Sequence, residues 1–215
     1  TGLESVVMGD SVEYVGSSAF LNCTSLESVS LGDAVNYIGE GAFSSTSLES
    51  VMIPASVATI EANPFVGSLN LKEITVSEDN LAYSSLDGVL YNKDRTTLCA
   101  CPGGKSSIEI PLSVEHIGPS AFCACAGLLS VTIPPTVESI EASAFGYCKE
   151  LTSVTIGKSV SRIGEYAFDR CDNLQDIYIY AELPPVIDAN TFEDYEATLY
   201  LSLIHISEPT RLLSI

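Results

Sequence analysis

Apolar positions return along this chain in a fixed order every 22 or 23 residues. The clearest copy runs from Leu128 to Glu150 and reads LLSVTIPPTVESIEASAFGYCKE. It opens as Leu-x-x-Val-x-Ile, continues through Val137 and Ile140, and closes with Ala-Phe-x-x-Cys at Cys148. The stretch that begins at Leu151 repeats this order, which indicates a stack of similar structural units.

Two markers of the repeat keep the same spacing along the chain. The opening leucines are Leu3, Leu26, Leu48, Leu71, Leu128, Leu151 and Leu174. The phenylalanines near the end of each copy are Phe20, Phe43, Phe65, Phe122, Phe145, Phe168 and Phe192. Because the two sets stay in step, we expect the copies to be coils of one solenoid, in which each coil packs on its neighbours.

Each copy predicts two short extended segments. In the copy that begins at Leu26, polar and apolar residues alternate, so we expect a strand with Val29 and Leu31 on its buried face. A second apolar segment follows through Val35 and Ile38.

The end of each copy predicts a change of chain direction. Gly39 follows the second segment, and we expect it to adopt a positive φ and turn the chain. Ala42 and Phe43 then predict a tight helical turn that places the aromatic ring inside the coil. Since one coil cannot bury both its strands and its ring, stability is expected to come from stacking.

One spacing is 57 residues instead of 23, which predicts an insertion at about residues 77–107. Two β-rich runs, Asp87–Tyr91 and Thr97–Pro102, flank the polar stretch Asn92–Arg95. This arrangement is typical of a β-hairpin. The repeat is expected to resume with a strand at Ile108–Ile110.

The pattern L-x-x-V-x-I-P-x-x-V-x-x-I-G-x-x-A-F-x-x-C resembles the BspA-like class of bacterial leucine-rich repeats. Asn80, Tyr83 and the run Asp87–Tyr91 are also similar to a variant coil of that class. The resemblance covers about residues 3–200. It implies an α/β-type but β-rich leucine-rich-repeat solenoid of about eight 22–23-residue coils, with one hairpin-like insertion.

The same resemblance implies a function outside the cell. Proteins of this class are secreted or anchored at the cell surface and bind other proteins or matrix without enzymatic activity. Their ligand-contacting residues vary too much to be carried over to this chain. The chain departs from the pattern at Glu61, Glu141 and Pro64, where we expect altered turn geometry.

Residues 1–200 are expected to form one leucine-rich-repeat solenoid. The stretch 201–215 breaks the pattern, and Leu201–Arg211 back-translates to a sequence that resembles a transposase sequencing adapter. We therefore expect 201–215 to be a non-native tail. Because Thr1 lies inside a repeat, we also expect the chain to be a fragment, so that the absence of a signal peptide carries no weight.

Composition narrows the classes of partner. The formal net charge is −19, whereas the phosphates of nucleic acids and anionic membrane surfaces attract Lys and Arg. We therefore expect no nucleic-acid partner. No apolar run approaches the roughly 18 residues of a membrane span, so no membrane insertion is expected in this fragment.

The seven cysteines are expected to be reduced thiols of the core. Cys23, Cys125, Cys148 and Cys171 each lie three residues after a repeat phenylalanine. A cysteine that recurs at one phase of a solenoid is expected to act as a small buried apolar group. Cys99-x-Cys101 and the similar pair at 123 and 125 are spaced more closely than structural zinc prefers, so we expect no metal and no cofactor.

No set of residues predicts catalysis. His116 is the only histidine outside the tail, and its counterparts in the next two copies are Ser139 and Arg162. We expect His116 to face solvent, because a general base needs a nucleophile and an orienting partner within reach. No Gly-rich phosphate loop or serine nucleophile motif is present in the sequence, and we expect the chain not to be an enzyme.

The outward face of the first strands is the remaining candidate site. Its residues by phase are Ser28, Ser30, Ser50, Met52, Glu73, Thr75, Ser130, Thr132, Ser153, Thr155, Asp176 and Tyr178. Solenoids bind partners through such faces. Tyr178 belongs to a residue type that is enriched at the energetic centres of interfaces. We expect this face to bind a protein or extracellular-matrix ligand.

The sequence thus predicts a non-enzymatic protein-recognition or adhesion module of a bacterial cell-surface or secreted protein. A structural spacer that carries another domain is an alternative. A polysaccharide-cleaving parallel β-helix is a further one, but it needs Asp with Lys or Arg gathered on one face. The nine basic residues of this chain are scattered.

Overall fold

The computed structural model describes residues 2–181, 183–188, 190–192, 198–201 and 210–214. The chain divides into two compact units, unit 1 (Thr1–Lys105) and unit 2 (Ser106–Ile215). Both units consist of short strands joined by turns, and the described residues contain no helix. The predicted β-rich leucine-rich-repeat solenoid of about eight coils is confirmed.

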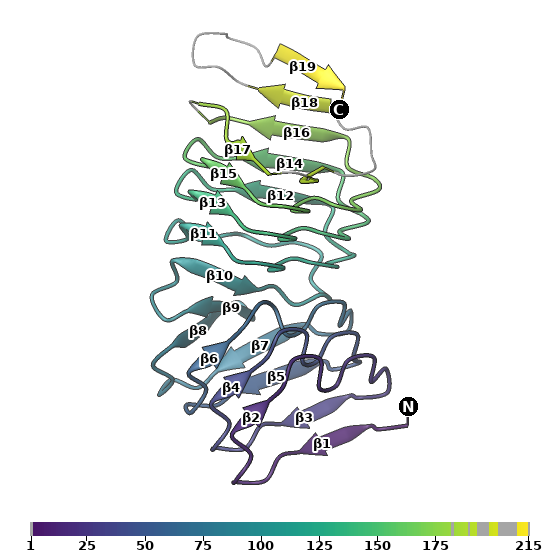
Figure 1. The fold of residues 1–215 in the computed structure, drawn as a ribbon, viewed down its shortest axis with the longest axis vertical. Helices are drawn as coiled ribbons and strands as arrows, with labels where there is room; N and C mark the ends of the chain where they lie inside the picture. Colours follow the sequence, from purple (N-terminus) through teal and green to yellow (C-terminus); the bar gives the residue numbers. More distant parts are fainter. Residues whose placement is uncertain (1, 182, 189, 193–197, 202–209, 215) are drawn as a thin grey trace. The chain divides into compact units, whose positions relative to one another are not determined.

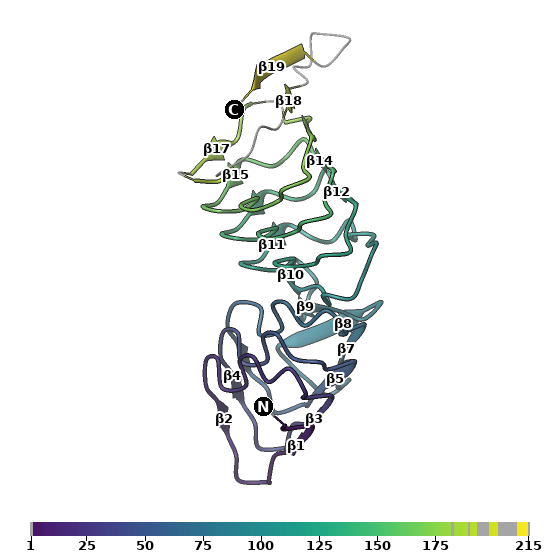
Figure 2. The same ribbon diagram turned by 90° about the vertical axis from the view of Figure 1, so that its right-hand side faces the viewer.

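The coils of unit 1 each contribute a first strand and a second strand. The first strands are β1 (Ser5–Val7), β3 (Ser28–Ser30), β5 (Ser50–Ile53) and β7 (Glu73–Val76) (Figure 1). The second strands are β2 (Tyr14–Val15), β4 (Tyr37–Ile38) and β6 (Thr59–Ile60). Within unit 1, the two sets of strands form opposite walls (Figure 2). All pairs between coils are parallel, and residues of equal phase lie side by side, as the repeat predicts.

The insertion of unit 1 contains three antiparallel strands, β8 (Tyr83–Leu86), β9 (Val89–Asn92) and β10 (Thr97–Ala100). The expected hairpin is the β9–β10 pair and is confirmed. The β8–β9 hairpin was not expected. Its two-residue turn is Asp87–Gly88, with φ of 49° and 75°. Positive φ at both positions is the conformation that Asp-Gly favours in hairpins, so the sequence carried this signal.

Asn80 anchors the insertion to the preceding coils. Its side chain is fully buried, and its Nδ2 donates hydrogen bonds to the carbonyl oxygens of Pro54 (2.8 Å) and Val57 (2.9 Å). Its Oδ1 accepts from the amides of Ala82 (2.9 Å) and Tyr83 (2.7 Å). One buried side chain therefore makes four hydrogen bonds to backbone groups on both sides of the start of the insertion.

Unit 2 repeats the same arrangement. Its first strands are β12 (Ser130–Ile133), β14 (Ser153–Ile156), β16 (Asp176–Ile179) and β18 (Thr198–Leu201), which pair in parallel, and β19 (Thr210–Ser214) pairs antiparallel with β18. Its second strands are β11 (His116–Ile117), β13 (Ser139–Ile140), β15 (Arg162–Ile163) and β17 (Val186–Ile187). Residues 202–209 and 215 of the predicted tail lie outside the described residues.

The strand expected at Ile108–Ile110 is absent as a hydrogen-bonded strand. The alternation of burial is nevertheless present, because Ile110 is buried while Ser107 and Glu109 are exposed. A strand is defined by its ladder of backbone hydrogen bonds, whereas apolar spacing reports only which side chains are buried. The expectation of a strand was therefore wrong, although the phase was right.

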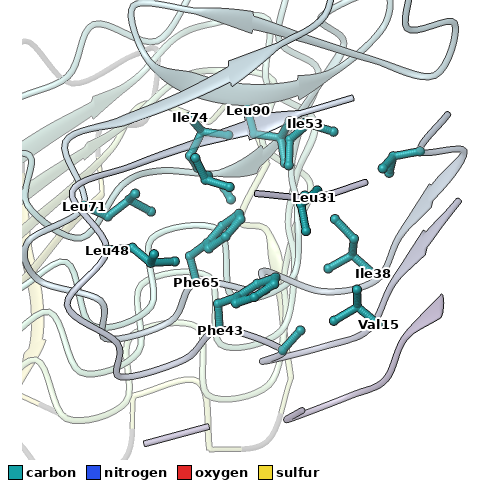
Figure 3. Packing of buried hydrophobic residues seen from close by; sticks show 14 of the residues in the cluster. Val15, Leu31, Ile38, Phe43, Leu48, Ile53, Phe65, Leu71, Ile74 and Leu90 are labelled. Carbon is teal, nitrogen blue, oxygen red and sulfur yellow. The ribbon is translucent and has the colours of Figure 1, made fainter. Parts of the chain in front are cut away.

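Stacked phenylalanine rings fill the interior of each unit. In unit 1, the centroids of Phe20 and Phe43 are 5.3 Å apart, and those of Phe43 and Phe65 are 5.8 Å apart. Figure 3 shows Phe43 and Phe65 among the leucine, isoleucine and valine side chains of neighbouring coils. In unit 2, the successive centroid separations are 4.7, 5.2 and 5.5 Å for the stack Phe122, Phe145, Phe168 and Phe192. The expected columns are therefore present within each unit.

The role expected for Gly39 was wrong. Its φ is not positive, and the left-handed residue is Gly41, two positions later, with φ of 63°. Gly39 is needed for close packing, because a Cβ there would lie 2.4 Å from the amide nitrogen of Ser17 in the preceding coil. The expected helical turn around Phe43 is instead a series of turns, in which the amides of Ala42 and Ser44 donate to carbonyls three residues earlier.

Candidate functional site

The first strands of unit 1 expose the predicted face. Ser28, Ser30, Ser50, Met52 and Glu73 are exposed, and Thr75 is half-buried. The side chains between them, such as Val51 and Ile53, are buried. Strand alternation therefore places the predicted residues of unit 1 on its outer surface, because neighbouring side chains of a strand point to opposite faces.

The first strands of unit 2 form a second face of the same kind. Its two predicted columns are Ser130, Ser153 and Asp176, and Thr132, Thr155 and Tyr178. Ser130 and Thr132 are exposed, whereas the four residues of β14 and β16 are half-buried. The structure thus brings the predicted residues of unit 2 into register. Whether either face binds a partner stays a prediction.

A row of glutamates at the edge of the unit 1 face was not among the predicted residues. Glu4, Glu27 and Glu49 are exposed and line one groove of about 650 Å³. The other lining residues are Ser5, Ser28, Ser47, Ser50 and Asn70. The signal was present in the sequence, because a Leu-Glu-Ser triplet opens each of the first three coils.

The second strands of unit 1 carry a polar cluster on their outer side. The rings of Tyr14 and Tyr37 stack at 4.2 Å with an angle of 8° between their planes. The Glu61 carboxylate accepts hydrogen bonds from the Tyr37 hydroxyl, the Glu40 amide (3.0 Å) and the Ser17 hydroxyl (3.2 Å). These bonds lower the pKa of Glu61, and the bond to the carboxylate raises the pKa of Tyr37.

At the two glutamates that replace the usual glycine, the regular hydrogen bond to the preceding coil is retained. The amide of Glu61 donates to Ile38 (3.0 Å), and the amide of Glu141 donates to Ile117 (2.9 Å). Pro64 lacks an amide hydrogen but accepts from the amide of Phe43 (2.8 Å) through its carbonyl oxygen. The backbone ladder therefore tolerates these departures.

His116 lies in the expected row but is half-buried. It pairs in register with Ser139, which pairs with Arg162. The Nδ1 of His116 lies 3.0 Å from the Ser139 hydroxyl, which donates to the Glu141 carboxylate at 2.7 Å. Because the serine hydroxyl donates its hydrogen bond to the Glu141 carboxylate and not to the His116 ring, the histidine is not placed to take its proton, and the three residues do not form a catalytic triad.

Cysteines occupy the core of unit 2 at the predicted phase. Cys125, Cys148 and Cys171 are buried, and the thiol of Cys148 donates to the carbonyl oxygen of Phe122 at 3.0 Å. Burial raises the pKa of Cys123 to about 11, which keeps this half-buried thiol protonated at neutral pH. Among the described residues, no group of three His, Cys, Asp or Glu side chains is arranged to hold a metal ion.

In two coils of unit 1, hydroxyl groups replace the thiol at this phase, whereas the first coil keeps a thiol in Cys23, which is half-buried. Thr46 and Ser68 each lie three residues after a phenylalanine and are buried. Both hydroxyls donate to the carbonyl oxygen of Phe43, at 3.0 and 2.8 Å. The position therefore requires a small donor that reaches the phenylalanine carbonyl, and either oxygen or sulfur meets this requirement.

The repeats of this chain match those of a known family. The profile of the BspA type Leucine rich repeat region matches six copies, over residues 1–91 and 99–209. This chain belongs to the BspA-type leucine-rich repeat family. A comparison with curated proteins found no match.

Solved structures of bacterial leucine-rich repeat proteins share the BspA-type fold of this chain. A leucine-rich repeat protein of Eubacterium ventriosum is 25% identical, with a TM-score of 0.74, over 92% of this chain and 59% of that one. A leucine rich cell surface protein of Faecalibacterium prausnitzii is 32% identical, with a TM-score of 0.67, over 82% and 54%. The pneumococcal vaccine antigen PcpA is 22% identical, with a TM-score of 0.72, over 94% and 64%, and this likeness shows the fold alone.

The BspA-type chain therefore spans between half and two thirds of the length of these proteins. Within the part of the chain that the structure describes, no helix has the length and apolar character needed to cross a membrane.

Proposed function

We propose that this chain is a non-enzymatic protein-recognition module of a bacterial cell-surface or secreted protein. It binds its partner through the outer faces of the first strands. The observation that carries this proposal is the accessible, in-register rows of side chains on those strands in both units. Solenoids present such extended faces to their ligands.

The comparisons support this proposal at the level of the family. Leucine-rich repeats of this type are generally scaffolds that mediate protein interactions. The relative from Faecalibacterium prausnitzii is described as a cell surface protein, which supports a location outside the cytoplasm. Family membership gives no support to the alternative of a polysaccharide-cleaving β-helix.

The face can be tested with substitutions that add bulk and charge. Ser30→Arg in unit 1 and Thr132→Arg in unit 2 would each place a long side chain on an exposed first-strand position. Ser11→Arg and Ser159→Arg are matched controls at exposed sites outside the first strands. Each protein would be immobilised and exposed to a panel of purified extracellular-matrix proteins, with the dissociation constant measured for every protein that is retained.

We expect at least one matrix protein to bind the parent chain. Ser30→Arg or Thr132→Arg should weaken that binding roughly tenfold, because an unpaired charge inside an interface costs more than 1 kcal/mol. The two controls should leave it within about twofold. Equal weakening by the controls would contradict binding through the first-strand faces. A parent chain that retains none of the panel would favour the alternative of a structural spacer.

A further inference from the structure

The first-strand face of unit 1 combines exposed apolar side chains with a row of carboxylates. Met52 is 58% exposed and Val7 is 81% exposed, and both lie on outward positions of their strands. Glu4, Glu27 and Glu49 lie at the edge of the same face, where they line the groove of about 650 Å³. We call the surface formed by these five residues and the serines between them the acidic face.

The carboxylates of the acidic face are held close together by the ladder. The amide of Glu27 donates to the carbonyl oxygen of Glu4 at 2.9 Å, and Glu49 lines the same groove as both. Neighbouring strands are about 4.8 Å apart, and like charges in adjacent positions repel one another. Within the described residues, none of the three carboxylates has a hydrogen bond or an ion pair. The row continues in the next coil with the exposed Lys72, so these four positions carry three negative charges and one positive charge, a formal net charge of −2.

Unit 2 differs at the same repeat position. The residues after its opening leucines are Leu129, Thr152 and Gln175, none of which is charged. The Thr152 hydroxyl donates to the carbonyl oxygen of Leu129 at 3.0 Å. The fold therefore does not require glutamate at this phase, and the acidic row is a property of the unit 1 surface alone.

We propose that the acidic face binds a cationic, extended protein segment in which Lys or Arg residues accompany apolar ones. This inference rests on the proposed function and specifies the partner of one of the two faces. Ammonium or guanidinium groups of the segment pair with Glu4, Glu27 and Glu49. Its apolar side chains and the aliphatic stems of its lysines cover Met52 and Val7, because such stems pack on apolar surface while their charges stay in water.

The proposal can be tested with synthetic peptides. The first probe is a ten-residue peptide of alternating Lys and Leu, and the second replaces each Lys with Glu. We expect the Lys peptide to bind the parent chain at low salt and the Glu peptide not to bind. The triple variant Glu4→Gln, Glu27→Gln and Glu49→Gln should weaken Lys-peptide binding roughly tenfold, because each exposed ion pair contributes a factor of about two.

A charge-matched variant separates local pairing from the overall negative charge. Glu13, Glu40 and Glu78 are exposed residues of unit 1 that do not line the groove. Replacing all three with Gln removes the same charge and should change the affinity by less than about twofold. Met52→Ser should weaken binding a few-fold and leave its salt dependence unchanged, because this substitution removes apolar contact only.

Two results would overturn the proposal. One is a parent chain that does not bind the Lys peptide, and the other is equal weakening by the two triple variants. The matrix-protein panel distinguishes this failure from failure of the proposed function. If Thr132→Arg still weakens binding of a matrix protein and the control Ser159→Arg does not, the first-strand faces recognise proteins, and only the cationic partner of unit 1 is wrong.

Discussion

The two units build the same coil from different polar residues. Three positions after the phenylalanine, two coils of unit 1 have the buried hydroxyls of Thr46 and Ser68, although its first coil has the half-buried thiol of Cys23. Unit 2 has the buried thiols of Cys148 and Cys171 at this position. In both units these groups donate to the carbonyl oxygen of a phenylalanine. The comparison shows that the repeat specifies the size and the hydrogen-bonding role of this residue but not its chemical type.

The same comparison separates architecture from recognition. The inward positions are apolar in both units, because burying apolar side chains between the coils is what stabilises the stack. The edge of the first-strand face is acidic in unit 1 and neutral in unit 2. Outward side chains do not determine whether the coils stack, so they can differ between the units without changing the fold, and the proposed function assigns the choice of partner to them.

The largest effect is expected from the aromatic stacks. Phe43→Ala in unit 1 and Phe145→Ala in unit 2 should each lower the free energy of unfolding by about 3–5 kcal/mol, because both rings are fully buried between two others. Urea denaturation followed by circular dichroism measures this loss. A variant as stable as the parent would contradict a closed interior in the corresponding unit.

A loss of about 3 kcal/mol is expected for Asn80→Ala, because four backbone groups in unit 1 lose their buried partner. Asn173→Ala in unit 2 is the control. It removes one exposed hydrogen bond to Lys149 and should cost less than about 1 kcal/mol. Hydrogen exchange should report faster opening of β8–β10 in the Asn80 variant. Unchanged exchange there would show that Asn80 does not anchor the insertion.

The buried hydroxyls of unit 1 and the buried thiols of unit 2 should contribute different amounts to the free energy of unfolding. Ser68→Ala leaves both the Phe43 carbonyl and the Thr46 amide without this partner and should cost about 2 kcal/mol. Cys148→Ala removes a weaker donor and should cost about 1 kcal/mol. The same urea measurement compares them. A larger loss for the cysteine variant would reverse the expected order and show that packing of the sulfur matters more than its hydrogen bond.

The smallest expected effect is on the stability lost at low pH, which should differ between the parent chain and a Glu61 variant. Bonds from Tyr37, the Glu40 amide and Ser17 lower the pKa of Glu61 in the folded state below its ordinary value of 4.5. The stability that these bonds contribute is therefore present above that value and is lost as pH falls through the folded-state pKa. Glu61→Gln should make unit 1 less sensitive to acid.

Thermal melting at pH 7 and at about pH 3 measures this acid sensitivity. Glu141→Gln, at the same repeat position in unit 2, is the matched control. If the parent and the Glu61 variant lose equal stability between the two pH values, the carboxylate does not contribute to the folded state of unit 1.

The spacing of leucines and phenylalanines was sufficient to predict the coils and the outward residues. It could not predict the missing strand at Ile108–Ile110, because burial and hydrogen bonding are separate properties of a chain segment. The packing role of Gly39 could not be predicted either, since the contact that requires glycine is with Ser17 of the preceding coil. The Asp87–Gly88 turn and the Leu-Glu-Ser triplets, in contrast, carry a clear signal in the sequence.

Residues of equal phase lie side by side in neighbouring coils, and cysteine cross-linking tests this arrangement most directly. Ser130 and Ser153 are register partners on β12 and β14, whereas Ser130 and Thr155 are two residues out of register. With a mild oxidant and the parent chain as a blank, Ser130→Cys with Ser153→Cys should form a disulfide. Ser130→Cys with Thr155→Cys should not, because its Cα atoms lie more than about 7 Å apart. Equal cross-linking of the two pairs would contradict the stacked coils and the binding faces built on them.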